Sequence, residues 1–236
     1  IEAKNSNIED RDMSIHTGYK PANNHKLIID FDYHWGDWGK PRGFNGPDKA
    51  FTKVRNQEEN YHTSMKYIIK VKKRLKEIHF STYFDHGQRD YYKYKFSTIT
   101  DKCTSLDLVH YKYDYSGGQL YGIFEFPGDH KLITGINGYI FRLGNPAELF
   151  DYYENTHGTQ GGYKDAGQQV GGVFMQDEWK IDKKFKLISG IRYDLAKVKE
   201  GVKSNLTSKE KEEKKESRYA ISGNLGGVYH IQDNQK

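Results

Sequence analysis

Alternation of apolar and polar residues, repeated along the chain, is the feature that most restricts how this protein folds. Between Leu27 and Trp35 every second residue is aliphatic or aromatic, and the residues between them are mostly acidic or polar. The same period of two recurs in Tyr61–Lys72 and Tyr219–Ile231. Successive side chains of a β-strand point to opposite faces, whereas a helix brings every third or fourth residue to one face. The sequence therefore predicts two-faced β-strands.

Nine segments carry this pattern, and Ser105–Tyr115 is a candidate for a tenth. The nine are Met13–Lys20, Leu27–Trp35, Tyr61–Lys72, Glu77–Asp85, Leu120–Phe126, Lys131–Phe141, Val170–Ile181, Phe185–Asp194 and Tyr219–Ile231. Several match the roughly 9–11 residues that a tilted strand needs to cross a membrane, rather than the about 5–6 of a globular strand. We therefore expect an all-β fold, an antiparallel meander of about 9–10 long strands within a transmembrane outer-membrane β-barrel.

The connections between these segments alternate in length. Short polar turns are expected at residues 21–25, 73–76, 128–130 and 182–184. Long polar stretches separate the other pairs, at residues 36–60, 86–119, 143–169 and 196–217. Outer-membrane barrels have short periplasmic turns and longer extracellular loops. The alternation therefore favours a membrane barrel, with the four long stretches as its extracellular loops.

Composition agrees with this fold class and excludes others. The chain has 19 Tyr and is 14% aromatic but only 35% hydrophobic, which argues against both disorder and a helical bundle. Cys103 is the only cysteine, so the sequence has no internal disulfide and no cysteine-based metal site. Lysines near residues 209–215 alternate with glutamates, which is typical of a solvated loop rather than a nucleic-acid-binding surface.

No motif in the sequence points to catalysis. Asp177 and Glu178 are adjacent in a predicted strand, so they face opposite ways and cannot act as a carboxylate pair. The ten histidines are scattered, without a His-Glu-x-x-His motif or a Cys/His cluster. We therefore expect no enzyme activity, no cofactor, no metal site and no nucleic-acid partner.

The alternation also predicts which side chains face lipid and which face the lumen. The expected lipid-facing residues are Leu27, Ile29, Phe31, Leu187, Ile191, Tyr219, Ile221 and Leu225. The expected lumen-facing residues are Asp30, Asp32, Lys66, Lys70, Arg192, Asn224 and His230. His34, His62 and His79 also lie on polar faces. In the lumen such histidines either touch a plug or ligand, or are simply hydrated wall residues.

Four segments resemble the barrel hairpins of TonB-dependent receptors. In Val173–Asp194, a strand ending in Gln-Asp-Glu-Trp turns tightly and returns as Gly-Ile-Arg-Tyr-Asp. Ser222–Asn234 looks like the next strand and turn of that family. Gly128–Tyr139 and Tyr83–Tyr92 are also similar to its hairpins. These matches carry the resemblance, and weaker similarity extends over most of the chain.

The resemblance implies a location and a function. TonB-dependent receptors lie in the bacterial outer membrane and take up scarce nutrients, usually a ferric siderophore, haem or a cobalamin-like compound, with energy supplied through TonB. Expected partners are outer-membrane lipid and lipopolysaccharide, the transported ligand, and the TonB–ExbB–ExbD system acting through a plug. The sequence contains no recognisable plug or TonB box, and barrels of this kind have about 22 strands. Residues 1–236 are therefore expected to be a partial, incomplete barrel domain.

Ligand contacts are expected in the long polar stretches, where aromatic residues gather. The candidates are Tyr91, Tyr92, Tyr94, Tyr152 and Tyr153. Tyrosine side chains stack on planar groups, form hydrogen bonds and lose little conformational entropy on binding. These five residues are the predicted ligand-binding site.

Two other function classes fit the same pattern. One is a small passive outer-membrane barrel of about ten to twelve strands, porin-like or enzymatic. The other is a soluble all-β binding protein. The three classes differ in whether a plug accompanies the barrel and in whether the apolar strand faces contact lipid.

Overall fold

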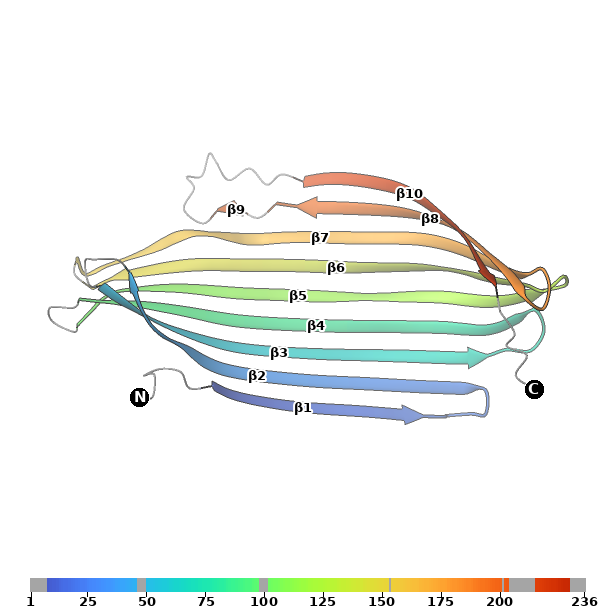
Figure 1. Ribbon diagram of the computed structural model, residues 1–236, viewed down its shortest axis with the longest axis horizontal. Helices are drawn as coiled ribbons and strands as arrows, with labels where there is room; N and C mark the ends of the chain where they lie inside the picture. The colour runs from blue at the N-terminus through green and yellow to red at the C-terminus, as the bar shows by residue number, and fades with distance from the viewer. Residues whose placement is uncertain are drawn as a thin grey trace.

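The computed structural model consists of one antiparallel β-sheet (Figure 1). It describes residues 8–45, 50–97, 102–152, 154–200, 202–203 and 215–229. Within those ranges every regular element is a strand, which confirms the all-β expectation. No helix in the described part of the chain has the length and apolar character to span a membrane.

The strands follow one another across the sheet in chain order. They are β1 (Ile8–Tyr19), β2 (His25–Asn45), β3 (Ala50–Lys70), β4 (Leu75–Phe96), β5 (Cys103–Phe126), β6 (His130–Asp151), β7 (Thr156–Lys180), β8 (Phe185–Lys199), the two-residue β9 (Val202–Lys203) and β10 (Lys215–Tyr229). The order is β1 to β8 and then β10, with β9 paired to β7. In the described residues β1 pairs only with β2 and β10 only with β8, so the sheet is open and curved.

Each of the nine predicted segments overlaps a different long strand, but the tenth candidate was wrong. Ser105–Tyr115 and Leu120–Phe126 belong to the same strand, β5. The sequence Ser116-Gly117-Gly118 between them has the composition of a turn. In the structure Gly117 instead pairs with Tyr83 on one side and Tyr139 on the other, so the ladder continues through the glycines.

The prediction of long extracellular loops was wrong for residues 36–60, 86–119 and 143–169, and most of the fourth stretch, residues 196–217, lies outside the described residues. Residues 36–45 and 50–60 are strand, and so are 86–96, 103–119, 143–151, 156–169 and 196–199. The strands β2 to β7 are therefore 21 to 25 residues long. The error has a physical cause. Apolar and polar residues alternate in a strand that has one face in an apolar environment and the other in water. A strand with water on both faces lacks this alternation, although its backbone hydrogen bonds to neighbouring strands remain.

The short turns at the other end are where the sequence placed them. Between β7 and β8 the carboxylate of Asp182 accepts hydrogen bonds from the backbone N–H groups of Lys184 at 2.6 Å and Phe185 at 2.8 Å. These bonds lower the pKa of the Asp182 carboxyl and close the turn. In the β5–β6 turn Gly128 has a φ of 86°, a conformation that glycine adopts without strain.

The two faces of the sheet differ as predicted. Along β8 the exposed residues alternate with half-buried ones, so that Ile191 is 54% exposed whereas Arg192 is sheltered. Side chains crowd one another on the concave face of a curved sheet, so the exposed set marks the convex, outward face. Ile29 and Ile191 are exposed, as expected for lipid-facing residues, and Tyr219, Ile221 and Leu225 lie on the same face by register, on a strand whose residues are all exposed. Leu27, Phe31 and Leu187 share their face but are half-buried between neighbouring side chains. Of the residues expected on the inner face, Asp30, Asp32, Lys66, Lys70, Arg192 and Asn224 lie there by register, and His230 is outside the described residues.

The exposed apolar residues of the outward face lie mainly in the half of each strand that adjoins the short turns. Examples are Phe80 and Phe84 on β4, Leu120 on β5, Ile136 and Ile140 on β6, and Val173 and Met175 on β7, all exposed. Beyond this apolar band the same face carries Glu59, Gln88, Lys112 and Arg142. A tilted strand crosses a membrane in about 9–11 residues, so β2 to β7 continue well past it. We call the parts beyond the band the extensions: residues 35–45, 50–60, 86–96, 103–115, 141–151 and 156–168.

Aromatic residues border the band on both sides. At the extension side Tyr33 stacks on Tyr61, with ring centroids 6.3 Å apart, and Arg11 covers Trp35 at 5.0 Å. At the short-turn side His130 stacks on Trp179 at 5.1 Å. Aromatic girdles at both interfaces are typical of membrane barrels, because these rings favour the boundary between lipid and water.

Candidate functional site on the inner face

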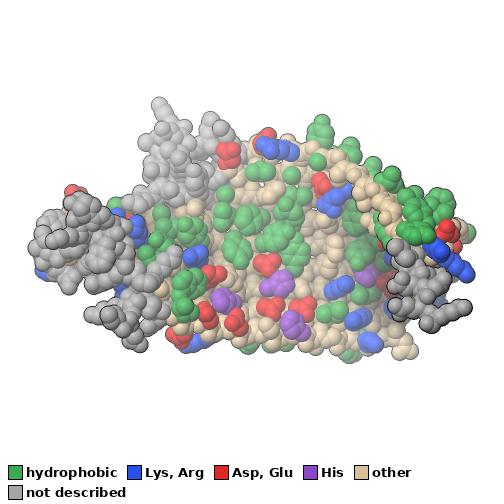
Figure 2. All heavy atoms as spheres, viewed as in Figure 1, with side chains coloured by type: hydrophobic (Ala, Val, Ile, Leu, Met, Phe, Trp, Pro, Cys, Tyr) green, Lys and Arg blue, Asp and Glu red, His purple; other side chains and the backbone are tan. Residues whose placement is uncertain are grey.

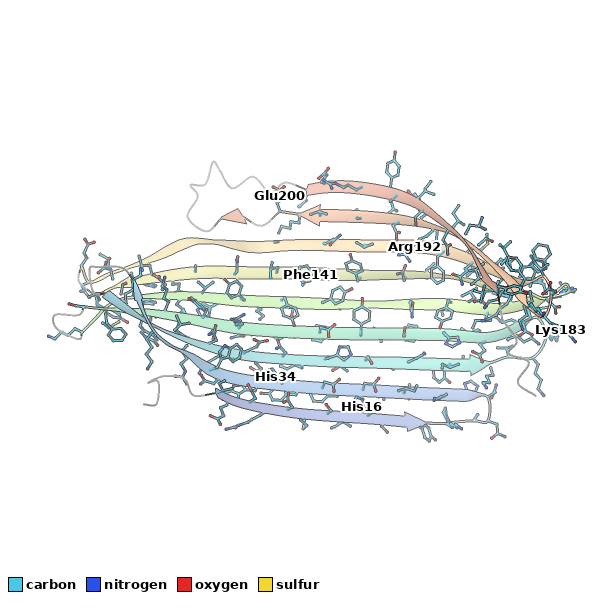
Figure 3. All side chains as sticks on the ribbon, in the orientation of Figure 1. His16, His34, Phe141, Lys183, Arg192 and Glu200 are labelled. Atoms are coloured by element: carbon cyan, nitrogen blue, oxygen red, sulfur yellow. The ribbon has the colours of Figure 1, made fainter. Side chains whose placement is uncertain are left out.

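Histidine and aspartate side chains gather on the inner face of β1 to β4. Figure 2 looks onto this face and shows the purple and red side chains together in the lower half of the view, and Figure 3 labels His16 and His34 among them. We call this group the histidine–aspartate cluster: Asp12, His16, Asp30, Asp32, His34, His62, Ser64 and Asp85.

Each histidine of the cluster contacts a carboxylate on a neighbouring strand. The Nδ1 of His16 lies 3.0 Å from Asp30, that of His34 lies 2.8 Å from Asp12, and that of His62 contacts Asp85. The Ser64 hydroxyl donates to Asp30 at 2.9 Å. Cross-strand register explains the pairing, because Asp32, His62 and Asp85 lie directly opposite one another on β2, β3 and β4. Four acids against three histidines give this wall an acidic character.

The cluster is not arranged as a metal centre. Within the described residues no three His, Cys, Asp or Glu side chains form a group that would hold a metal ion. Each imidazole is engaged by a carboxylate instead. The cluster is therefore a hydrogen-bonded polar wall, suited to contact cations or hydrogen-bond donors.

Aromatic rings cover the inner face of the next strands, β4 to β6. Tyr83 and Tyr115 have ring centroids 5.1 Å apart, Tyr115 and Tyr139 are 5.2 Å apart, and Phe141 lies 6.3 Å from Tyr115. The hydroxyl of Tyr83 lies over Gly117, where an added Cβ would meet it at 2.5 Å. This glycine thus makes room for the ring, and the strip offers a flat surface for stacking.

A buried polar group lies higher on the inner face, in the extensions. Arg89 lies 5.6 Å from the centre of the Trp38 ring and donates to the Asn56 side-chain oxygen at 2.9 Å. Asn56 is fully buried. Among the described residues, the Arg89 Nε and the Asn56 Nδ2 find no hydrogen-bond partner. Both of these donors are buried, so the parts of the group that another molecule can contact are the partly exposed Arg89 side chain and the Trp38 ring.

The structure separates the three predicted tyrosines of β4. Tyr91 lies on the inner face, opposite Asn56 and two residues beyond Arg89. Tyr92 and Tyr94 lie on the outward face, where their rings stack with centroids 6.4 Å apart. The expectation that all three share a loop was wrong, because this stretch is strand and successive side chains alternate.

The outward pair of tyrosines adjoins a salt bridge. Arg55 pairs with Asp37 through two nitrogens, and its Nε lies 2.9 Å from the Asp37 Oδ1. The hydrogen bonds from Arg55 lower the pKa of the Asp37 carboxyl, and burial raises the pKa of the Tyr92 hydroxyl. This is a packed strand surface rather than an open binding loop.

The two remaining predicted tyrosines follow β6. Tyr152 is exposed in the turn after that strand, and its backbone N–H donates a hydrogen bond to the backbone carbonyl oxygen of Thr104 at 2.9 Å. Tyr153 lies outside the described residues. The structure therefore does not bring the five predicted residues into one site, and their role in ligand binding stays a prediction.

The histidines expected in the lumen divide in a similar way. His34 and His62 belong to the histidine–aspartate cluster. His79 lies near the short turns, bonded to Glu77 at 2.7 Å and stacked on Tyr121 at 4.6 Å. His230 is outside the described residues.

Sequence reasoning missed Asn56 and Arg89 because both fell in stretches interpreted as loops, and it placed Trp38 in such a loop. A signal was nevertheless present. Counting in steps of two from Asp85 along a continued strand places Arg89 and Tyr91 on the same face as the lumen residues. The inner face as a whole carries aromatic rings for stacking, hydrogen-bonding groups, and an acidic cluster that is separate from the Arg89 cation. Side chains of these kinds can bind a ligand.

Comparisons with known proteins agree with this geometry. The profile of the family described as "TonB dependent receptor-like, beta-barrel" matches residues 4–236. No curated protein matches the chain. Among solved structures, a copper transporter, OprC, is similar with a TM-score of 0.74 and 15% identity over 97% of this chain. The ferric citrate transporter FecA in its unliganded form is similar with a TM-score of 0.76 and 13% identity over 98% of this chain.

A siderophore receptor, PiuA from Acinetobacter baumannii, gives a TM-score of 0.70 and 13% identity over 99% of this chain. At these identities the comparisons establish the fold. The chain spans 35% of the length of OprC and of FecA, and 41% of PiuA. Its strands therefore correspond to a section of a larger barrel in each of these structures.

Proposed function

The chain belongs to the TonB-dependent receptor β-barrel family, and from this premise we propose that it forms part of the wall of an energy-coupled nutrient transporter. The family places it in the bacterial outer membrane. The observation that carries the proposal is the contrast between the two faces. An exposed apolar band bordered by aromatic rings covers the outward face, and the inner face carries charged and aromatic groups over strands longer than a membrane requires.

This contrast argues against the alternatives. In a soluble protein the outward apolar residues would face water, which costs about 25 cal/mol for each Å² left exposed. A passive pore would share the apolar band but not the match to the receptor family. The similar structures are described as transporters and a receptor, which agrees with the expectation that the chain is not an enzyme.

We further propose that the transported ligand is a ferric chelate rather than haem or a cobalamin-like compound. OprC, FecA and PiuA are described as handling copper, ferric citrate and a siderophore. In this chain Arg89 and Tyr91 supply a cation and a hydroxyl on the inner face, beside the Trp38 ring. A guanidinium binds carboxylate or catecholate oxygens, and an aromatic ring stacks on planar chelators. The acidic cluster on β1 to β4 would repel an anionic chelate toward Arg89.

Coupling to energy belongs to the same proposal. Members of the family are driven by TonB, with ExbB and ExbD, through a plug inside the barrel. The histidine–aspartate cluster and the partly exposed Arg89 side chain would face such a plug or the ligand above it. The outer contacts would be with lipid and lipopolysaccharide.

Uptake of labelled iron by cells that produce the full-length protein tests this function. We expect accumulation from a ferric chelate that stops when the proton-motive force is collapsed or TonB is absent. The double variant Trp38→Ala/Arg89→Gln should reduce uptake about tenfold, equivalent to roughly 1.4 kcal/mol of binding. The matched control Arg11→Gln, on the outward face of β1, should transport normally. Uptake that continues without energy would identify a passive barrel instead.

A further inference from the structure

Two of the short turns at one end of the sheet concentrate positive charge. From Lys70 to Lys76, between β3 and β4, five of seven residues are Lys or Arg and none is acidic. From Lys180 to Lys186, between β7 and β8, four residues are Lys and one is acidic, Asp182. The Asp182 carboxylate is already engaged by the backbone of its own turn. Both turns therefore carry a net positive charge.

The cations at the tips of these turns are exposed, whereas those that follow them on the strands are paired. Lys76 lies 3.1 Å from Glu125, and Lys186 lies 3.3 Å from Glu178. The exposed cations, which we call the basic rim, are Lys72, Lys73, Arg74, Lys180, Lys183 and Lys184. Figure 3 labels Lys183 at this end of the sheet. Within the described part of the chain no acidic side chain pairs with the basic rim, so its charges repel one another.

The backbone of the first turn singles out Lys73. Its φ is 89°, in the region that glycine adopts without strain and that other residues rarely occupy. Glycine at this position would give a more relaxed turn. Lysine there costs folding stability and places an ammonium group at the tip of the turn. Strained positions of this kind are typical of functional sites.

The two halves of the basic rim are too far apart for one small anion. In the sheet order, β5 and β6 lie between β4 and β7. At about 4.8 Å per strand, β4 and β7 are roughly 14 Å apart. An extended polypeptide covers about 3.4 Å per residue, so a run of about five acidic residues reaches both halves. The spacing thus fits an acidic protein surface rather than a free anion.

The position of the basic rim favours a partner in water over one in the lipid. Trp179 belongs to the aromatic border of the apolar band, and Lys180, Lys183 and Lys184 follow it, beyond the hydrocarbon. By register Lys180 shares the inner face with Glu178, and so points away from the lipid. In an outer-membrane barrel the short turns lie in the periplasm. A soluble periplasmic protein can therefore reach the basic rim.

We propose that the basic rim docks the acidic face of a soluble periplasmic protein, which contacts both turns at once. This partner is distinct from the TonB system, which acts through a plug. The proposal rests on the proposed function only for the placement of the short turns in the periplasm.

Peptides of ten and of four glutamates, labelled with fluorescein, serve as acidic probes. Fluorescence anisotropy measures their binding to the full-length protein in phosphatidylcholine nanodiscs at physiological ionic strength. Extended, the longer peptide spans about 34 Å and the shorter about 14 Å. Only the longer peptide has length to spare for engaging both turns, and engaging both raises its effective concentration at the second. We expect it to bind at least about tenfold more tightly than the shorter one.

Variants of each turn test this bridging. The two triple variants are Lys72→Gln/Lys73→Gln/Arg74→Gln and Lys180→Gln/Lys183→Gln/Lys184→Gln. In either one, the affinity of the longer peptide should fall to within about twofold of that of the shorter peptide for the unmodified protein. Heat-modifiable migration on gels establishes that each variant is folded.

The matched control removes three exposed cations from the outward face in the other half of the sheet. This variant is Lys112→Gln/Arg142→Gln/Lys197→Gln. Its affinity for the longer peptide should stay within about twofold of that of the unmodified protein.

Three outcomes would overturn the proposal. One is an equal loss of affinity in the control, and another is equal binding of the two peptides, which would mean attraction to single cations. The third is loss of peptide binding when phosphatidylglycerol replaces phosphatidylcholine, because the basic rim would then be covered by lipid head groups. Absence of energy-dependent iron uptake by the unmodified protein, with peptide bridging intact, would contradict the proposed function alone.

Discussion

The guanidinium of Arg192 on β8 reaches across β7 and donates a hydrogen bond to the side-chain oxygen of Asn137 on β6 at 3.0 Å. The same guanidinium holds Asp194 with bonds of 2.6 and 2.7 Å. Gly172 of β7 lies between the two strands in register, and Arg192 is labelled in Figure 3. A Cβ at Gly172 would overlap the Asp194 carboxylate and lie 3.0 Å from the Arg192 Nη2. The missing side chain is what allows Arg192 to link β8 to β6 across β7.

Replacing Gly172 by valine should therefore break this link. We expect the free energy of unfolding to fall by about 1–2 kcal/mol, the range for a partly exposed hydrogen bond to a charged group. Urea titration of the full-length protein in lipid vesicles measures this change. Gly171→Val is the matched control, because an added Cβ there meets nothing within 4 Å. Equal losses for the two variants would mean that the link is unimportant.

Adjacent residues of β7 should differ sharply in their tolerance of charge. Met175 is on the outward face, 48% exposed, in the middle of the apolar band, and Gln176 faces inward. Met175→Lys should cost roughly 2–4 kcal/mol of folding free energy in a bilayer, as lysine does at the midplane of other barrels. Gln176→Lys should be nearly neutral, since Glu178 is within reach of its position. The same vesicle titration compares them, and similar costs would mean that the faces are wrongly assigned.

The positions of the β4 tyrosines give opposite expectations for ligand binding. Tyr91 shares the inner face with Arg89, so Tyr91→Ala should weaken ligand affinity about tenfold, or roughly 1.4 kcal/mol. Tyr92→Ala/Tyr94→Ala should leave the affinity unchanged, because those rings point outward. Equilibrium binding of the ferric chelate to cells, with surface expression as the control, measures both. A larger loss for the outward pair would move the site to the outer surface.

The salt bridge between Arg55 and Asp37 should make the β2–β3 extension sensitive to acid. The Asp37 pKa is lowered below its ordinary value of 3.8, mainly by hydrogen bonds from Arg55. A carboxyl with a depressed folded-state pKa stabilises the fold above its unfolded pKa, and this contribution is lost as the pH falls through the folded-state pKa. Pepsin cleavage within residues 35–60 should therefore increase below that pH. The Asp37→Asn variant should be cleaved readily at every pH tested. If cleavage of this variant still increases on acidification as in the unmodified protein, the Arg55–Asp37 salt bridge is not the cause of the acid sensitivity.

The membrane-crossing half of the fold could be predicted from sequence for a definite reason. Neighbouring residues such as Ile191 and Arg192, or Leu225 and Asn224, face different environments. Apolar and polar residues therefore alternate along the strand with a period of two. The Asp182 turn was predictable as well, because the aspartate carboxylate bonds to the backbone N–H groups that follow it.

The extensions could not be predicted in the same way. Arg89, Asp90 and Tyr91 alternate in direction, but water lies near both faces, and their polarity therefore does not alternate. Backbone hydrogen bonds between neighbouring strands hold the extensions together, and these bonds depend little on which side chains are present. The buried Asn56 with Arg89 is a long-range contact between two such stretches, and no local pattern specifies it.

The length of the extensions determines how far the inner face reaches beyond the membrane. On β5, residues 103–115 continue the strand beyond the apolar band. At about 3.4 Å per residue and a tilt of roughly 35–45°, they rise on the order of 30 Å above the hydrocarbon. That height exceeds the head-group layer and extends into the sugar coat of the cell. Under the proposed function, a ligand would therefore contact the inner face of the extensions before it reaches the membrane.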